Sequence, residues 1–206
     1  MTKTVAIKIG SGVILTDRNK PDEFRIAHIR DQIVSLRNKN ISPLLIVSGA
    51  VGCGMNFVES EDENSKKAAA GIGQAHLVSV FIKYFSAKNL NLAQLLFTKD
   101  LFLSEAGRQS AKNILEYYIT QGIIPFINEN DAIELNSFGG NDCLAKEIAS
   151  LIGANQVIIL SQMSESIHGV GGGKTKLRIV EELNQKGIRT SILNGKERNI
   201  IENNIV

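Results

Sequence analysis

The chain alternates between short apolar runs that fit buried strands and longer runs whose apolar residues recur at helical spacing. The strand-like runs cover residues 5–9, 44–47, 91–97, 123–127, 155–160 and 188–193. The helix-like runs cover residues 22–36, 66–88, 109–121, 141–152 and 175–186. This alternation predicts βαβ units with right-handed crossovers, and therefore an α/β fold with a mainly parallel sheet covered by helices.

Length and charge limit the class of protein. The 206 residues fit one α/β domain or at most two small ones, and a hydrophobic fraction of 43% suffices for a core. The 23 basic and 21 acidic residues give a net charge of +2 without a basic stripe, so nucleic acid is not an expected partner. We find neither a secretory signal nor the roughly 18 consecutive apolar residues of a membrane span. We therefore expect a cytoplasmic protein without a membrane partner.

The two cysteines, Cys53 and Cys143, lie far apart and lack CxxC spacing, which argues against a disulfide framework and a zinc site. Cys143 adjoins a polar cluster, so it is either a nucleophile or a buried packing thiol. We favour the packing thiol because no base signature accompanies it.

Polar side chains crowd the end of one predicted strand. Asn128, Glu129, Asn130 and Asp131 follow the apolar run 123–127, and an Asn-Asp pair at 141–142 opens the next helical pattern. Open α/β sheets bind ligands at the carboxyl ends of their strands. The cluster therefore predicts a site for a small, charged, polar ligand.

Three glycine-rich segments end predicted strands or open a predicted helix. They are K-I-G-S-G at 8–12, V-S-G-A-V-G-C-G at 47–54 and G-V-G-G-G-K-T-K-L at 169–177. Glycines let backbone N–H groups approach phosphate oxygens, and lysines add positive charge. The structural alternatives are a strand-end turn, a strand-to-helix turn and a flexible linker, respectively.

Together these segments favour phosphoryl transfer without a covalent intermediate, which requires positioning and charge neutralisation. Lysines from two sides of the site could neutralise the moving phosphoryl group. Asp142 is our candidate for a carboxylate that holds both ammonium groups. We expect Mg²⁺ to accompany the nucleotide phosphates.

Several motifs resemble those of the amino acid kinase superfamily and, within it, the glutamate 5-kinases. They occur in the family's order and cover most of the chain: K-I-G-S at 8–11, V-S-G-A-V-x-x-G at 47–54, A-A-A-G-I-G-Q at 68–74, Q-L-L-F-T at 94–98, A-K-N at 111–113, I-N-E-N-D-A at 127–132 and G-G-x-x-T-K-L at 171–177. I-N-E-N-D-A followed by N-D is fairly specific for the glutamate kinase branch, whereas the lysine-glycine start would fit any branch.

The resemblance implies ATP-dependent phosphorylation of the γ-carboxylate of L-glutamate, the first step of proline biosynthesis. It implies that Lys8 binds the transferring phosphoryl group, that Lys176 stabilises the transition state and that Asp142 orients both lysines. It assigns glutamate binding to Ser48, Gly49, Asp131 and Asn141. It assigns nucleotide binding to Lys8, Gly10, Ser11, Ser161, Gln162, Val170, Gly171, Gly172, Gly173, Lys174, Thr175 and Lys176. It implies no metal ligand from the protein.

The resemblance also implies an architecture and partners. We expect a three-layer α/β/α sandwich with an open, mostly parallel sheet, formed by residues 1–206 as a single domain. Residues 1–150 would form the glutamate half and residues 151–206 a shortened nucleotide half, with no C-terminal RNA-modification-type domain. We expect a homo-oligomer, either a dimer or a tetramer, with proline as a candidate feedback inhibitor.

The chain also departs from the family pattern. Gly140 and Gln162 stand where the family usually has aspartate, and the stretch between Leu160 and the glycine-lysine segment is shorter than usual. Three hypotheses follow: a glutamate 5-kinase of minimal length, a kinase of the same superfamily for another carboxylate or phosphate, and a degenerate member that binds a small acid or serves as a subunit.

The acidic segment at 59–65 carries four carboxylates within seven residues. We interpret it as a loop, either one that covers the substrate or a solvated hairpin.

Overall fold

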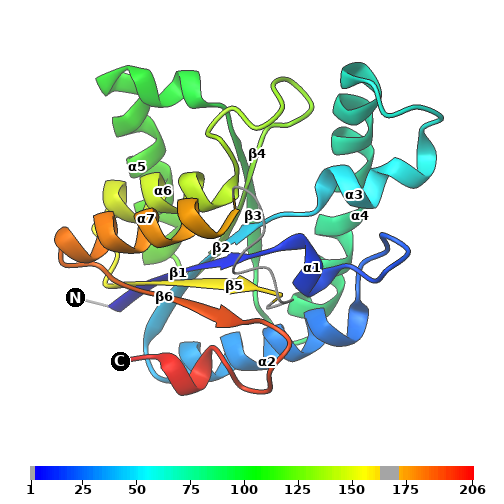
Figure 1. Cartoon of the computed structure of the whole chain (residues 1–206). Helices are drawn as coiled ribbons and strands as arrows, with labels where there is room; N and C mark the ends of the chain where they lie inside the picture. Colours follow the sequence, from blue (N-terminus) through cyan, green and yellow to red (C-terminus); the bar gives the residue numbers. More distant parts are fainter. Residues whose placement is uncertain (1–2, 163–171) are drawn as a thin grey trace.

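The computed structural model describes residues 3–162 and 172–206, and every strand in this part of the chain belongs to one parallel sheet (Figure 1). The strands are β1 (Lys3–Ile9), β2 (Ile41–Val47), β3 (Leu92–Phe97), β4 (Ile124–Glu129), β5 (Gln156–Ser161) and β6 (Arg189–Asn194). They lie in the order β3-β4-β2-β1-β5-β6. The six strand-like runs and the parallel sheet are therefore confirmed.

Helices cover both faces of this sheet. They are α1 (Ser11–Ile14), α2 (Glu23–Asn38), α3 (Ala50–Gly54), α4 (Glu63–Ser86), α5 (Glu105–Thr120), α6 (Asn141–Ile152) and α7 (Gly172–Gln185), with 3-10 turns η1 (Met55–Phe57), η2 (Lys99–Leu103) and η4 (Glu202–Asn204). α5, α6 and α7 cover one face, and α2 and α4 cover the other (Figure 1). The predicted three-layer sandwich is confirmed.

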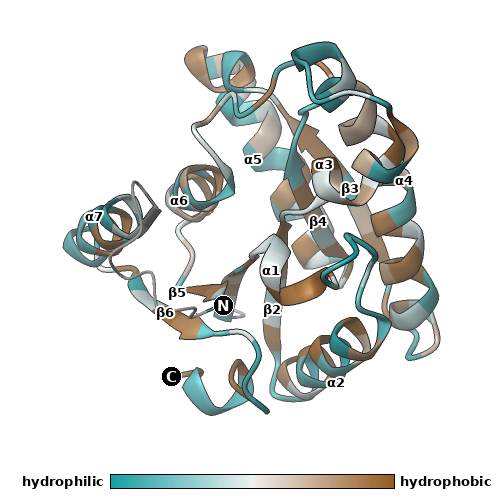
Figure 2. Cartoon of the chain, turned by 45° about the vertical axis from the view of Figure 1, so that its right-hand side comes forward, coloured by the Kyte–Doolittle hydropathy of each residue, from teal (hydrophilic) through white to brown (hydrophobic). Residues whose placement is uncertain are grey.

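Two hydrophobic cores, one on each face, enclose the central strand β1. Val5, Ile7 and Ile9 pack against α2 and α4, whereas Ala6 joins the core under α5, α6 and α7. Figure 2 shows that apolar residues gather on the strands and on the sides of the helices that face them. Lys8 is the exception in β1: it shares the face of Ala6 by alternation and is only 7% exposed. A buried ammonium group of this kind needs an anionic partner.

Helices α3 and α4 pack very closely. Gly54 of α3 faces the backbone of α4, and Gly73 of α4 faces the backbone of α3. A Cβ atom at Gly73 would lie 1.9 Å from the Ala50 oxygen, and one at Gly54 would lie 1.8 Å from the Ala69 oxygen. α3 directly follows the glycine-rich end of β2, so this crossing fixes the loop that borders the candidate site.

The interpretation of the acidic segment as a loop is wrong for its second half. α4 begins at Glu63, and the side chain of Asp62 accepts a hydrogen bond from the backbone N–H of Ser65. Asp62 is therefore an N-cap, and the carboxylate of Glu63 lies in the first turn, where the helix dipole favours negative charge.

None of the helices in the described ranges 3–162 and 172–206 has both the length and the apolar character that a membrane crossing requires.

Candidate active site

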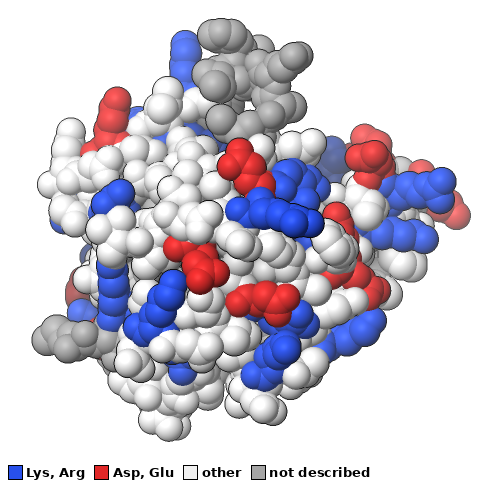
Figure 3. All heavy atoms as spheres, turned by 90° about the horizontal axis from the view of Figure 1, so that it is seen from below, with Lys and Arg blue, Asp and Glu red and all other residues white. Residues whose placement is uncertain are grey.

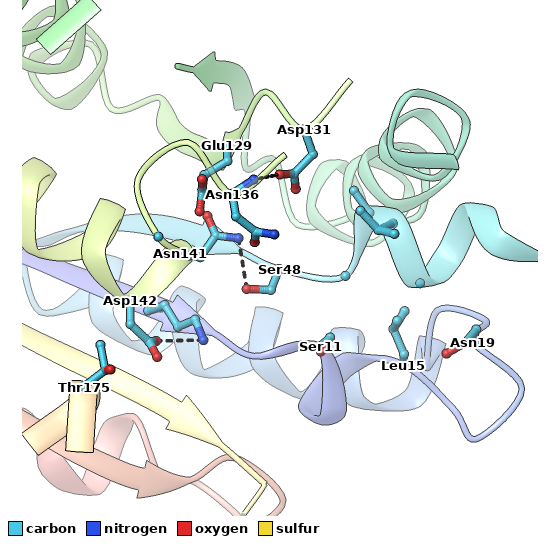
Figure 4. Close-up of a pocket in the computed structure, with 17 residues that line it drawn as sticks. Ser11, Leu15, Asn19, Ser48, Glu129, Asp131, Asn136, Asn141, Asp142 and Thr175 are labelled. Atoms are coloured by element: carbon cyan, nitrogen blue, oxygen red, sulfur yellow. Dashed lines mark hydrogen bonds and ion pairs between the residues drawn. The ribbon is translucent and has the colours of Figure 1, made fainter. Parts of the chain in front are cut away.

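A polar cavity of about 560 Å³ opens at the carboxyl ends of β1, β2 and β4, beside the start of α6 (Figure 4). The polar cluster was expected to bind a ligand at this edge of the sheet, and residues of the first two glycine-rich segments lie there as well. The cavity is lined by Lys8, Ser11, Leu15, Asn19, Ser48, Gly49, Ala50, Val51, Gly52, Glu129, Asp131, Asn136, Gly139, Gly140, Asn141, Asp142 and Thr175.

Asp142 lies between two lysines that come from different elements. Its Oδ1 is 2.8 Å from Nζ of Lys8 on β1, and its Oδ2 is 3.4 Å from Nζ of Lys176 on α7. Asp142 itself lies in the first turn of α6, where the helix dipole also stabilises its negative charge. The structure therefore brings together the three residues expected to be catalytic, whose roles stay predictions.

A chain of side-chain hydrogen bonds runs from the cavity lining into the buried interior. Nδ2 of Asn141 donates to Oγ of Ser48 at 3.0 Å and to Oδ1 of Asn128 at 2.7 Å, and Asn128 in turn donates to Gln74 at 2.9 Å. Oδ1 of Asn141 is buried and accepts no hydrogen bond from any described residue. It is therefore an acceptor that an incoming donor can satisfy.

Two carboxylates hold the loop that joins β4 to α6. Oδ1 of Asp131 accepts the backbone N–H of Asn136 at 2.8 Å, and Oε2 of Glu129 accepts the backbone N–H of Phe138 at 3.0 Å. Burial raises the pKa of both carboxyl groups above the ordinary value, chiefly by desolvation. Glu129 and Asp131 both line the cavity, so the same groups shape the loop and set the charge of the site.

The backbone at Gly140 has a conformation that favours glycine. At this position the sequence departs from the family pattern. Its φ of 103° lies in the left-handed region, as does the φ of 83° at Gly139. An L-residue at either position would be strained even where space is open. The backbone conformation of this chain at position 140 therefore suits the glycine that stands there in place of the family's usual aspartate.

The residues expected at the nucleotide are only partly gathered at the cavity. Lys8, Ser11 and Thr175 line it, as do the expected glutamate ligands Ser48, Gly49, Asp131 and Asn141. The following expected residues lie outside the cavity lining: Gly10, Ser161, Gln162, Gly173, Lys174 and Lys176. Val170 and Gly171 lie outside the described residues.

Gln162 lies against the first helix. A Cβ atom at Gly12 would lie 2.7 Å from Oε1 of Gln162, so the end of β5 and the start of α1 are in close contact. Gly10 is also close to β5, since its N–H donates to the oxygen of Leu160 at 3.0 Å. The first glycine-rich segment is therefore anchored to the end of β5.

Sequence reasoning missed several lining residues. Leu15 and Asn19 belong to the connection between α1 and α2, which carries no ligand pattern, and Asn136 lies in a loop whose shape the sequence does not reveal. Glu129 was visible within the polar cluster but was not assigned to the site. Its position as the last residue of β4 was the available signal.

Among residues 3–162 and 172–206, no group of three or more histidine, cysteine, aspartate or glutamate side chains has the arrangement of a metal site.

A family model and several similar proteins point to the same family. Residues 3–190 match the amino acid kinase family. The chain is similar to a glutamate 5-kinase of Clostridium acetobutylicum, with 29% identity that covers 97% of this chain and 89% of the relative. It is also similar to a glutamate 5-kinase of Alkaliphilus metalliredigens, with 28% identity over 97% of this chain and 90% of the relative. A glutamate 5-kinase 2 of Bacillus subtilis is 34% identical over 78% of this chain and 45% of the relative.

The alignment with the Clostridium protein runs over 238 positions, although this chain has 206 residues. Some residues of that relative therefore have no counterpart here.

Solved structures of low identity share the fold. A UMP kinase of Ureaplasma parvum superimposes with a TM-score of 0.66 at 14% identity, covering 98% of this chain and 94% of that one. An isopentenyl phosphate kinase of T. acidophilum superimposes with a TM-score of 0.66 at 11% identity, covering 94% and 92% of the two chains.

Proposed function

Because the chain belongs to the amino acid kinase family, we propose that it transfers the γ-phosphoryl group of ATP to the γ-carboxylate of L-glutamate. The observation that carries this proposal is Asp142, held between the ammonium groups of Lys8 and Lys176 beside a polar cavity. The full-length similarity to glutamate 5-kinases supports glutamate as the acceptor.

The glutamate side of the cavity offers acceptors for an α-ammonium group. The carboxylate of Asp131 uses one oxygen for the loop, and Oδ1 of Asn141 is buried without a partner. A substrate ammonium group can donate to both, which removes the cost of the unpaired amide oxygen. Ser48 and Gly49, at the carboxyl end of β2, complete the proposed glutamate site.

In the proposed reaction an oxygen of the γ-carboxylate attacks the γ-phosphorus of ATP, and the bond from that phosphorus to the bridging oxygen breaks as ADP leaves. Negative charge on the moving phosphoryl group is neutralised by Lys8 from the sheet side and by Lys176 from α7. Asp142 positions the two ammonium groups and does not touch the reacting atoms.

The nucleotide phosphates would lie near Gly10, Ser11 and the start of α7, where Gly172, Gly173, Lys174 and Thr175 precede Lys176. Backbone N–H groups at the start of a helix suit phosphate oxygens. The described residues offer no protein cluster for a metal ion, and both oxygens of Asp142 face lysines. Mg²⁺ therefore enters this proposal bound to the phosphates of ATP, where it supplies further positive charge.

The test is direct. We would incubate the purified chain with ATP, Mg²⁺ and L-glutamate, and trap the acyl phosphate as its hydroxamate. The proposal expects product from the native chain, little from Lys176→Ala and a native yield from Lys66→Ala, a lysine that does not line the cavity. No product above the Lys176→Ala level would contradict the proposal, and a clear preference for aspartate or N-acetylglutamate would reassign the acceptor.

A second candidate is a member of the family that binds a small acid without catalysis. It is favoured by the relative's residues that have no counterpart here. This candidate predicts that L-glutamate raises the melting temperature of the protein whereas ATP does not.

Several finer expectations from the resemblance stay predictions. They are the place of the reaction in proline biosynthesis, inhibition by proline, homo-oligomeric assembly and a cytoplasmic location. The assignment of residues 1–206 to one domain, with halves that divide near residue 150, also stays a prediction.

A further inference from the structure

A second cavity, of about 390 Å³, lies between the start of α2 and the segment that follows β6. Its lining consists of Phe24, Arg25, His28, Lys196, Arg198 and Asn199. It shares no lining residue with the candidate active site. Its volume is within the range of small-molecule sites, which is about 300–1,000 Å³.

The lining carries three basic side chains and no carboxylate. Arg25, Lys196 and Arg198 form no ion pair with any residue of the described ranges. The face that contains α2 and the C-terminal segment shows numerous lysine and arginine side chains (Figure 3). Unbalanced positive charge inside a concavity favours an anionic ligand.

The acidic residues at the start of α2 are engaged elsewhere. Asp22 caps α2 by accepting the backbone N–H of Arg25, and Glu23 pairs with Lys83 at 2.8 Å. Glu197 lies between Lys196 and Arg198 in the sequence, yet it does not line the cavity. The charge of the cavity is therefore not cancelled by its sequence neighbours.

Hydrogen bonds hold the lining in place. Nη1 of Arg25 donates to the backbone oxygen of Lys196 at 2.8 Å, and Nζ of Lys196 donates to the oxygen of Val13 at 3.1 Å. The backbone N–H of Asn199 donates to Nε2 of His28 at 3.3 Å. Nε of Arg25 is buried without a hydrogen-bond partner, which leaves a donor for an acceptor oxygen.

Phe24 adds an apolar surface to this basic lining. Its side chain is 76% exposed, although it is a large aromatic residue at the mouth of a cavity. An exposed ring in a lining that also carries two arginines matches a ligand that combines a planar ring with an anionic group.

We propose that this basic cavity is a binding site for a phosphate-bearing small molecule with an aromatic ring, of the nucleoside monophosphate class, separate from the site of phosphoryl transfer. The cations hold the phosphate, and the exposed ring of Phe24 stacks on the base. The proposal rests on the second cavity alone and does not depend on the proposed kinase activity.

The test uses AMP as the probe and the Lys8→Ala chain, in which phosphate binding at the candidate active site is weakened. Binding is followed by the NMR signals of the arginine Nε–H groups, with ribose 5-phosphate and adenosine for comparison. We expect AMP to shift the Arg25 signal and to bind more tightly than either fragment. Arg198→Gln should weaken AMP binding at least about 10-fold, because a charge-assisted contact is lost.

The matched control is Arg189→Gln, which removes an exposed arginine at the opposite end of β6 and should leave AMP binding unchanged. Phe24→Ala should weaken AMP but not ribose 5-phosphate. An affinity for AMP that is unchanged by Arg198→Gln would overturn the proposal. Binding of a single-stranded oligonucleotide without binding of AMP would overturn it as well. A failed kinase assay with intact AMP binding would reject only the proposed activity.

Discussion

Asp142 contacts two ammonium groups that approach from opposite sides, one from the central strand and one from α7. We predict that Asp142→Asn lowers the free energy of unfolding by about 3 kcal/mol, because the buried Lys8 loses its anion. We also predict a fall in phosphoryl transfer of at least about 100-fold, since both lysines lose their positioning group. Urea denaturation and the hydroxamate assay measure the two effects.

Glu147→Gln is the matched control, because it also removes a carboxylate of α6, but one that lies 3.8 Å from Lys146 and away from the cavity. Glu147→Gln should change neither the free energy of unfolding nor the rate of phosphoryl transfer appreciably. Equal effects of the two substitutions would show that Asp142 acts only through the net charge of α6.

Burial of Glu129 gives a pH dependence with a definite sign. Its folded-state pKa lies above the ordinary value of 4.5, so between these two pKa values the folded state binds more protons than the unfolded state. The contribution of Glu129 to stability must therefore fall as the pH rises through this interval. We predict that Glu129→Gln, whose amide oxygen can still accept the N–H of Phe138, gains stability relative to the native chain from pH 4.5 upward.

Urea denaturation of both proteins at several pH values between 4 and 7 measures this difference. A difference that stays constant with pH would show that the carboxyl group titrates alike in the folded and unfolded states.

At the residue scale, the sequence revealed side chains whose type conflicts with their surroundings. Lys8 in an apolar strand and Asp142 at a helix start were both conspicuous, and the structure brings them to 2.8 Å. Asn136 and Leu15 were not conspicuous, because a loop asparagine and a leucine after a short helix are common. Their place in the cavity depends on loop shape, which local pattern does not encode.

At the scale of elements, the crossing of α3 and α4 depends on Gly73. Alanine is a better helix former than glycine by roughly 0.5–1 kcal/mol, so propensity alone predicts that Gly73→Ala is stabilising. A Cβ atom at Gly73 would lie 1.9 Å from the Ala50 oxygen and 2.5 Å from the Gly54 nitrogen. We predict a net loss of at least about 2 kcal/mol in the free energy of unfolding, measured by urea denaturation.

Gly71→Ala provides the comparison within the same helix. The nearest atom to its Cβ position, Cβ of Ala132, lies 3.8 Å away, which is an ordinary contact. We expect this substitution to be neutral or stabilising. If Gly73→Ala behaved like Gly71→Ala, the two helices would not be locked by their close approach.

The elements themselves were largely predictable, because buried parallel strands appear as short apolar runs between helical patterns. The six runs all became strands, whereas the acidic segment at 59–65 was misinterpreted. An N-cap within a run of charged residues is hard to predict, because the same aspartate and serine residues are common both in loops and in the first turn of a helix. In the structure, the hydrogen bond from the N–H of Ser65 to the side chain of Asp62 and the backbone bond from the N–H of Lys66 to the oxygen of Asp62 identify the helix start.

At the scale of the whole molecule, the two halves of the candidate site predict separable ligand effects. Saturating L-glutamate should raise the melting temperature of the native chain and of Lys176→Ala, whereas ATP with Mg²⁺ should raise that of the native chain far more than that of Lys176→Ala. Asp131→Asn should lose the response to glutamate and keep the response to ATP. Differential scanning calorimetry at fixed protein concentration measures all of these shifts.

A response to glutamate that is abolished by Lys176→Ala and kept by Asp131→Asn would contradict the division of the cavity proposed here.

The central position of β1 has a consequence for protein synthesis. One edge of β1 pairs with β2 at residues 41–47, but its other edge pairs with β5, which begins at Gln156. While the ribosome makes the chain, that second edge has no strand beside it until most of the polypeptide has been translated. Unpaired strand edges invite association with other chains. During synthesis, this edge of β1 therefore stays open to association with other chains until residues 156–161 have been made.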